Sequence, residues 1–144
     1  MFSKSCEYAI RAVIYLSAES NRDNKLGIDI ICEKIEAPKH FTAKILQVLS
    51  KRHIIGSQKG VNGGFYMDSK QSNKSLIEIV EAIDGNDIFT QCGIGLSECS
   101  EKEPCPLHQK FKEIRNQLTQ MLRETTIVEL SKKLEGKTGF LKSL

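Results

Sequence analysis

The chain has 144 residues, of which 27% are charged, and a net charge of +3. This length fits one domain with an appended element, and it allows only a modest core. No apolar run approaches the roughly 20 residues that cross a bilayer. Glu7 and Arg11 interrupt the N-terminal apolar stretch, so no signal peptide is expected. We therefore expect a cytoplasmic protein with no membrane partner.

The charge is unevenly distributed. Residues 1–74 contain twelve Lys or Arg and seven Asp or Glu, whereas residues 75–144 contain nine and eleven. Between Ala37 and Met67 there are five basic residues and no acidic one. A window of one sign is typical of a surface that contacts phosphates, although a solvated cationic face has the same composition.

The first part of the chain predicts three helices. The stretch from about Ser5 to Glu19 is apolar on nearly every side, which indicates a helix buried on several faces. A short helix from about Gly27 to Ile35 is followed by a turn at residues 36–38. A further helix runs from Pro38 to about Arg52. Two helices joined by a tight turn indicate a helix-turn-helix.

The second helix of this pair carries polar and basic groups at its N-terminal end. An apolar stripe with helical spacing is expected to face the core: Phe41, Ile45, Val48 and Leu49. The residues that open the helix, largely off this stripe, are Lys39, His40, Thr42 and Lys44. The N-terminal residues of a recognition helix reach base edges, so we predict that these four contact DNA.

A hairpin follows the recognition helix. Residues 54–58 and 64–67 have the pattern of two short strands, and Asn62-Gly63 between them is a strong turn signal. A hairpin in this position is a wing. Lys59, with Gly60 beside it at the tip, is expected to approach a phosphate or enter a minor groove.

Three of the five cysteines lie in one later loop. Cys92, Cys99 and Cys105 are separated by six and then five residues, and His108 follows after two more. Cysteine thiolates hold iron–sulfur clusters, sometimes with histidine in place of a cysteine. Pro106 after Cys105 is typical of a helix start, and a helix N-terminus lowers the pKa of a thiol. The loop therefore favours thiolate chemistry.

The spacing of these cysteines leaves several interpretations open. Cys6 and Cys32 lie in apolar helical stretches, where a free thiol behaves as a small hydrophobic residue. An odd cysteine count without a signal peptide argues against a disulfide framework. A zinc site with three cysteines and one histidine is an alternative, although a tight C-x₂₋₄-C pair is missing. An iron–sulfur cluster of two or four irons, a zinc ion and plain thiols all remain open.

The second half of the chain predicts further helices. Residues 75–84 form an amphipathic pattern that ends at Gly85, and Ile127 to Leu134 form a short helix. Between them, apolar residues recur with steps of three and four at Leu107, Phe111, Ile114, Leu118, Met121 and Thr125. This seam is under three heptads long, and its pattern alone fits an intramolecular core or a dimer interface. The tail from 137 is expected to fray.

Three motifs in chain order resemble the Rrf family of bacterial winged-helix transcription regulators. They are EYAIRA at 7–12, KGVNGGF at 59–65 and the cysteine triad. The resemblance covers nearly the whole chain. It implies a homodimer that binds DNA with one cluster per protomer, and it favours a dimer interface formed by Phe111, Ile114, Leu118 and Met121.

The resemblance also bears on the fourth cluster ligand. His108 matches the three-cysteine, one-histidine pattern of the family's iron–sulfur regulators, and its position near the triad supports it. Glu7 stands where the family's nitric-oxide sensors supply a carboxylate from the partner protomer. The resemblance therefore leaves His108 and Glu7 as the two alternatives.

Together these observations predict a mostly α fold with a small β wing, in three parts. Residues 1–74 form the winged helix-turn-helix, 75–105 the connecting helix and cysteine loop, and 106–144 the dimerisation helix and tail. The expected function is a transcriptional repressor of a roughly palindromic operator, controlled by a cluster that senses nitric oxide, redox state or iron–sulfur supply. The alternatives are a zinc-stabilised repressor and an electron-transfer protein. No motif supports an enzyme.

Overall fold

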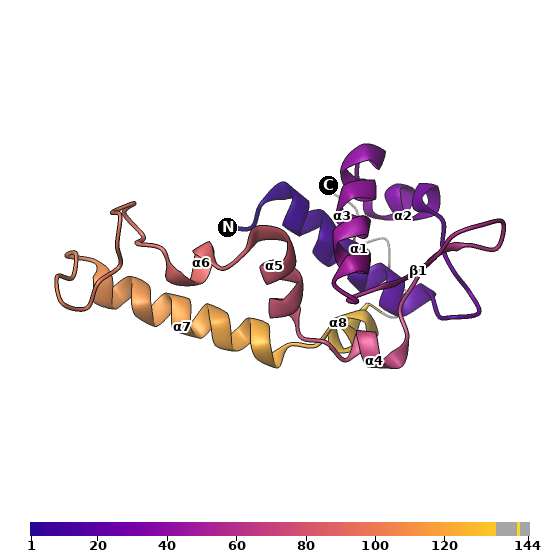
Figure 1. The fold of residues 1–144 in the computed structure, drawn as a ribbon. Helices are drawn as coiled ribbons and strands as arrows, with labels where there is room; N and C mark the ends of the chain where they lie inside the picture. Colours follow the sequence, from indigo (N-terminus) through magenta and orange to yellow (C-terminus); the bar gives the residue numbers. More distant parts are fainter. Residues whose placement is uncertain (135–140, 142–144) are drawn as a thin grey trace.

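A computed structural model describes residues 1–134 and Leu141 (Figure 1). The tail from residue 137, for which the sequence predicts fraying, lies outside the described residues except for Leu141. The elements, in chain order, are α1 (Lys4–Glu19), α2 (Ile28–Ile35), α3 (Lys39–Lys51), β1 (Gly56–Gln58), β2 (Gly64–Tyr66), α4 (Ser69–Ser72), α5 (Leu76–Asp84), α6 (Asp87–Thr90), α7 (His108–Glu124) and α8 (Ile127–Lys133). Within the described residues, no helix is long and apolar enough to span a membrane. The predicted fold class, mostly α with a small β wing, is confirmed.

We call α1 to α5, the two strands and α8 the body. Helix α1 lies at its centre, against α2, α3, α5 and α8 (Figure 1). It is buried on several sides, as its composition predicts; its buried side chains are Cys6, Ala9, Ala12, Val13, Ile14, Tyr15 and Leu16. Ser3 caps its N-terminus by accepting a hydrogen bond from the main-chain N–H of Cys6. One apolar core therefore joins the helix-turn-helix to the later helices.

The helix-turn-helix is formed by α2 and α3, but α3 buries a different face from the predicted one. The fully or nearly buried side chains are Thr42, Ile45, Leu46 and Leu49, with the spacing i, i+3, i+4, i+7. Phe41 and Val48, predicted on the apolar stripe, are 46% and 37% exposed. Thr42 tolerates burial because its hydroxyl donates to the carbonyl of Pro38.

The wing is a two-stranded antiparallel hairpin in which Gly56 pairs with Tyr66 and Gln58 with Gly64. Its loop extends away from the body on the right of Figure 1. Gly60 has φ +103°, a conformation that favours glycine. An additional bridge joins Leu26 to Phe65, so the wing is tied to the segment before α2 as well.

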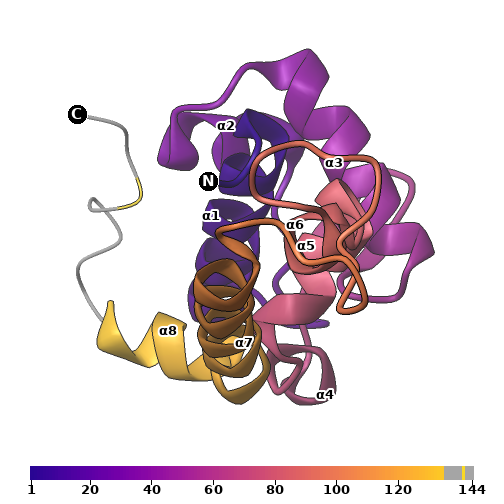
Figure 2. The ribbon, with the colours of Figure 1, turned by 90° about the vertical axis from the view of Figure 1, so that its left-hand side faces the viewer.

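Helix α5 begins with a capping box between Ser75 and Glu78 and ends at Gly85. The chain then leaves the body through α6 and the loop at 91–107, which returns into α7. Helix α7 begins at His108 rather than at Pro106, because residues 105–108 form a turn instead. We call α6, this loop and α7 the arm; it projects away from the body in Figure 1 and is viewed along α7 in Figure 2.

Helix α8 returns to the body. The N–H of Leu76 donates to the carbonyl of Thr125 at 2.9 Å, and that of Ile127 donates to Lys74 at 3.1 Å. Ile127 is fully buried in the core that contains α1. The sequence analysis places α8 in the same part of the chain as α7, at 106–144. In the structure α8 packs against α1 of the winged-helix part.

Candidate DNA-reading surface and cysteine loop

The start of α3 presents several exposed side chains. His40 and Lys44 are exposed, and Lys39 is exposed while its Nζ lies 2.7 Å from the carboxylate of Asp29. Because this ion pair is solvent-exposed, it holds Lys39 only weakly. Residues predicted to open the recognition helix are thus available at one end of α3, except for Thr42.

Thr42 is a correction to the predicted DNA contacts. Its side chain is fully buried, and its hydroxyl is bonded to Pro38 at 2.9 Å, so it faces the core and not a DNA groove. The exposed neighbour is Phe41, whose ring lies 4.4 Å from that of His40 between centroids. An apolar ring here can contact a thymine methyl group. Sequence reasoning missed Phe41 because its helical position also fitted a core stripe.

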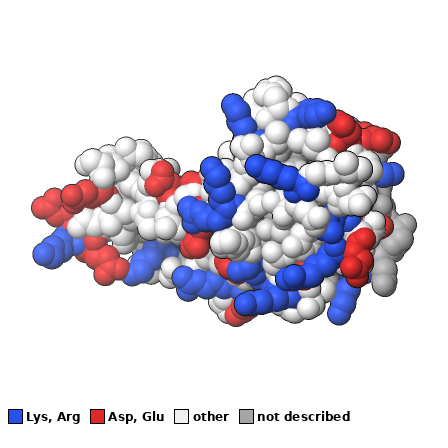
Figure 3. Space-filling model, turned by 45° about the vertical axis from the view of Figure 1, so that its right-hand side comes forward, with Lys and Arg blue, Asp and Glu red and all other residues white. Residues whose placement is uncertain are grey.

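The wing tip is exposed throughout, from Lys59 to Asn62. Val61 at the tip is fully exposed. Figure 3 shows Lys and Arg side chains spread over the visible face of the body, with Asp and Glu side chains toward its right-hand and lower edges, and both signs on the projecting arm. Residues 1–74, which carry α3 and the wing, contain twelve Lys or Arg and seven Asp or Glu, so the excess of positive charge lies in this part of the chain.

The four candidate ligands of the loop lie in two close pairs. The sulfur atoms of Cys92 and Cys105 are 3.9 Å apart, and the sulfur of Cys99 lies 3.4 Å from Nδ1 of His108. Among the described residues, no three His, Cys, Asp or Glu side chains converge as a single metal ion requires. The structure thus brings the predicted ligands together two by two.

Cys92 lies in a concave arrangement of main-chain amides. Hydrogen bonds from the N–H groups of Ile94 and Leu96, and more weakly of Gly95, lower the pKa of the Cys92 thiol, and the Cys105 thiol lowers it further. Successive N–H groups that point at one atom form an anion-binding nest. Cys6 in α1 shows the opposite: burial, and then the nearby Asp84, raise its thiol pKa to about 12.

The loop encloses space beside these sulfurs. A hollow of about 420 Å³ is lined by residues of the segment 90–99, including Cys92 and Cys99. His108 is buried, and its Nε2 atom has no hydrogen-bond partner among the described residues. A buried polar atom without a partner is costly, so a ligand for it is expected. Cys92 and Cys99 line the hollow, whereas Cys105 and His108 are each paired with one of them and do not line it. Three thiols and one imidazole are a donor set that iron–sulfur clusters accept.

Helix α7 holds the loop through one face. A Cβ atom on Gly93 would lie 2.6 Å from the ring of Phe111, so the loop packs directly on that ring. Lys112 forms an ion pair with Glu101. Arg115 donates hydrogen bonds to the sulfur of Cys99 and to a main-chain carbonyl of the loop.

The predicted dimer seam is divided between two environments. Phe111 contacts the loop, and Leu118 packs in the cluster around the buried Leu122. Ile114 and Met121, by contrast, are 60% and 48% exposed. With Leu107, 40% exposed, they form an unpartnered apolar line at intervals of seven residues.

Glu7, the alternative fourth ligand, lies in the first turn of α1. Its carboxylate is 2.9 Å from Nζ of Lys4, which lowers the pKa of Glu7 chiefly through this hydrogen bond. The contact is local to α1.

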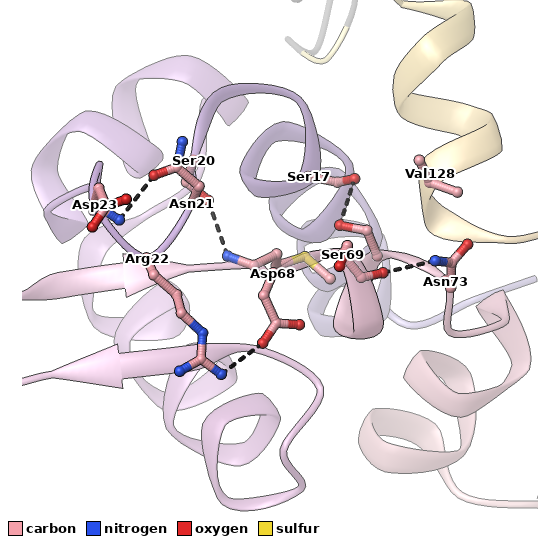
Figure 4. Close-up of a pocket in the computed structure, with 11 residues that line it drawn as sticks. Ser17, Ser20, Asn21, Arg22, Asp23, Asp68, Ser69, Asn73 and Val128 are labelled. Atoms are coloured by element: carbon pink, nitrogen blue, oxygen red, sulfur yellow. Dashed lines mark hydrogen bonds and ion pairs between the residues drawn. The ribbon is translucent and has the colours of Figure 1, made fainter.

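A second hollow, of about 430 Å³, lies where the end of α1 meets α4 and α8 (Figure 4). Arg22 forms an ion pair with Asp68 across it at 3.0 Å, and the hydroxyl of Ser17 donates to that of Ser72. Ser17 is also 3.1 Å from Ser131 of α8. These contacts join the end of α1 and the segment after it to α4 and α8.

The fold and its reading surface define a winged helix-turn-helix protein. The family model of Rrf2, described as an iron-dependent transcriptional regulator, matches residues 2–133. This chain therefore belongs to the Rrf2 family of transcriptional regulators, and the predicted resemblance is confirmed.

One relative supports the same assignment, and solved structures of low identity share the fold. A predicted helix-turn-helix-type regulator of Aquifex aeolicus is 31% identical over 132 residues, which cover 90% of each chain. The regulator IscR of Escherichia coli is 23% identical over 85% of this chain and 75% of its own. Among solved structures, CymR, the global cysteine regulator of B. subtilis, has a TM-score of 0.74 at 18% identity, covering 92% and 97% of the two chains. IscR of T. potens has a TM-score of 0.72 at 14% identity, covering 94% and 89%.

Proposed function

We propose that this transcriptional regulator is a repressor whose operator affinity is controlled by an iron–sulfur cluster bound in the loop at 91–107. The observation that carries the proposal is the arrangement of three thiols and one imidazole in two close pairs, with one member of each pair, Cys92 and Cys99, lining a hollow of about 420 Å³. A relative named IscR has the same fold, which is consistent with iron–sulfur chemistry in this family.

The two pairs support a two-iron cluster more than a zinc ion. A structural zinc ion needs four donors that converge on one point. Each iron of a two-iron cluster takes two protein ligands, so its donors are expected in two pairs. Cys92 with Cys105 and Cys99 with His108 match this requirement.

These residues have distinct roles in the proposal. The main-chain amides around Cys92 stabilise its thiolate, and Nδ1 of His108, 3.4 Å from the sulfur of Cys99, would supply the fourth donor. When bound, the cluster supplies iron that reacts with nitric oxide or oxygen. Loss of these ligand bonds would remove the links that the cluster makes between the loop and His108 of α7, while the contacts of Phe111, Lys112 and Arg115 with the loop would remain. A difference of a few kcal/mol between two arm positions shifts their populations substantially.

DNA binding is proposed to use two protomers. The exposed line Leu107, Ile114 and Met121 of α7 is expected to pack against its counterpart in a second copy, because apolar side chains at this spacing form helix–helix seams. Two copies of α3 and the wing, related by a twofold axis, then recognise a roughly palindromic operator. Lys39, His40 and Lys44 would reach the major groove, while Lys59 and Gly60 would approach the backbone or minor groove.

The direct test is a visible absorption spectrum of anaerobically purified protein together with iron and zinc analysis. We expect visible absorbance with iron, and we expect Cys92→Ala, Cys99→Ala and Cys105→Ala each to abolish it. Cys32→Ala is the matched control, since this thiol lies in α2 away from the loop. Zinc without visible absorbance would contradict cluster sensing and support the zinc-stabilised repressor.

The fourth ligand and the switch need separate measurements. His108→Ala should perturb the spectrum and Glu7→Gln should not; the reverse result would assign the ligand to Glu7. Operator affinity of each cysteine variant should change in the same direction as that of wild-type protein after cluster loss. If the triple variant binds DNA like the wild-type holoprotein, the cluster is not the switch.

A further inference from the structure

Arg115 lies where no ligand or DNA contact was expected, on the face of α7 that carries the loop. One terminal nitrogen of its guanidinium donates to the sulfur of Cys99 at 3.2 Å. The other donates to the carbonyl oxygen of Gln91 at 2.5 Å. Gln91 directly precedes Cys92, so a single side chain joins both ends of the segment that lines the hollow.

The sulfur of Cys99 receives a second contact from the same helix. His108 lies two turns before Arg115, and its Nδ1 atom is 3.4 Å from that sulfur. Arg115 and His108 therefore approach Cys99 from the same face of α7. The position of Cys99 is thus set by helix side chains, whereas that of Cys92 is set by amides of its own loop.

The charge of Arg115 is directed at sulfur. Among the residues that the structure describes, no carboxylate forms an ion pair with it, whereas the neighbouring Lys112 is paired with Glu101. A guanidinium keeps its proton under all ordinary conditions, and hydrogen bonds from a charged donor are stronger than neutral ones.

We propose that Arg115 is a positioning residue of the cysteine loop that holds Cys99 against α7 and stabilises negative charge on its sulfur. The effect of Arg115 on a reduction potential rests on the proposed cluster, whereas its positioning of Cys99 does not. Hydrogen bonds to ligand sulfurs and the net charge around a cluster set its reduction potential. A fixed cation beside Cys99 favours the reduced, more negative state, and its removal should therefore lower the potential.

The test compares Arg115→Gln, Arg115→Lys and Arg123→Gln in anaerobically prepared holoprotein. Arg123 is the matched control, because it lies in the last turn of the same helix and is exposed. Arg115→Gln should make the midpoint potential more negative and should speed cluster loss to a chelator about tenfold, in the range for outer-shell partners. Arg115→Lys, which keeps the charge but not both hydrogen bonds, should be intermediate. Potentials and loss rates equal to those of wild type in both Arg115 variants would overturn the proposal.

A second measurement uses metal-free protein and does not depend on a cluster. Hydrogen exchange of the amides in residues 91–99 should be faster in Arg115→Gln than in wild type, and unchanged in Arg123→Gln. Unchanged exchange in Arg115→Gln would overturn the positioning role. If wild-type protein binds no cluster but this exchange difference is found, the proposed function fails and the positioning role of Arg115 is retained.

Discussion

The body and the arm are stabilised in different ways. In the body, α1 is surrounded by four helices, and side chains such as Leu46, Leu49 and Ile55 are almost completely buried. In the arm, by contrast, Ile94 and Leu96 are about half exposed, and the loop is held on α7 by polar contacts to a sulfur and a carbonyl. The body is therefore stabilised mainly by buried apolar side chains, whereas the loop is held by the ring of Phe111 and by a few hydrogen bonds and one ion pair.

The largest expected effect is on the core of the body. Leu46→Ala should lower the free energy of unfolding by about 2–5 kcal/mol, because it removes a fully buried side chain and leaves a cavity. The matched change in the arm, Leu96→Ala, should cost no more than about 0.5 kcal/mol, since Leu96 is 53% exposed. Urea unfolding of the two metal-free variants measures both values. Equal losses would refute the distinction between body and arm.

The second prediction concerns the exposed line on α7. Ile114→Glu should convert a dimer into a folded monomer, because the new charge would be buried without a partner only in the dimer. Sedimentation measures the mass, and circular dichroism verifies the fold. Gln117→Glu, also exposed on α7, should remain dimeric. A dimer that survives Ile114→Glu would place the interface elsewhere.

The third prediction compares the two kinds of thiol. Cys6 has its pKa raised to about 12 in the folded protein, so its contribution to stability is present below pH 9 and is lost as the pH rises toward 12. Cys6→Ala should therefore destabilise the protein at pH 7, and this deficit should shrink by about 1–2 kcal/mol at pH 10.5. Cys105→Ala in the half-exposed loop is the comparison. Urea midpoints at the two pH values decide the outcome; a constant deficit for Cys6→Ala would contradict it.

The fourth prediction separates two neighbours on α3. Phe41→Ala should change operator preference by about 1 kcal/mol at one base pair, if its exposed ring contacts a thymine methyl group. Thr42→Val should leave this preference unchanged and reduce stability, because only a buried hydroxyl bonded to Pro38 is lost. Binding to a panel of single-base operator variants measures the preference. A specificity change in Thr42→Val would place Thr42 in the reading surface after all.

The smallest expected effect is at the wing tip. Lys59→Ala should weaken DNA binding and reduce the salt slope by about one unit if Lys59 neutralises one phosphate. Lys70→Ala, an exposed lysine of α4, serves as the control. Titrations at several salt concentrations give the slope, and a slope identical to that of wild type would remove Lys59 from the interface.

Local patterns predicted most of the elements. The amphipathic pattern at residues 75–84, the glycines and Asn62 between the wing strands and the apolar surface of α1 are all local sequence features. The turn itself spans Gly60 to Gly63, one step earlier than the Asn62-Gly63 signal predicts. Which face of α3 is buried depends on long-range packing and could not be predicted from these local patterns. Phe41 and Thr42 fit a buried position almost equally by periodicity, and only the packing of α3 against α1 selects Thr42.

The loop shows the same division between local and distant information. Its cysteines were recognised from spacing, yet their arrangement in two pairs depends on how the loop folds back on α7. The contact between Arg115 and Cys99 spans sixteen residues of sequence and follows no short motif. The return of α8 to α1 likewise depends on the pairing of Ser75 with Thr126, which no local signal indicates.

That pairing has an architectural consequence. The chain departs at Lys74–Leu76 and comes back at Thr125–Ile127, and two main-chain hydrogen bonds fasten these points side by side. The arm, from α6 to the end of α7, is thus a single excursion that leaves the body after α5 and returns at α8, two helices that both pack on α1. An excursion of this kind can grow, shrink or exchange its chemistry without moving its attachment points, since lengthening a closed loop costs little free energy. A change of length or sequence within the arm can therefore leave the positions of α1, α3 and the wing unaltered.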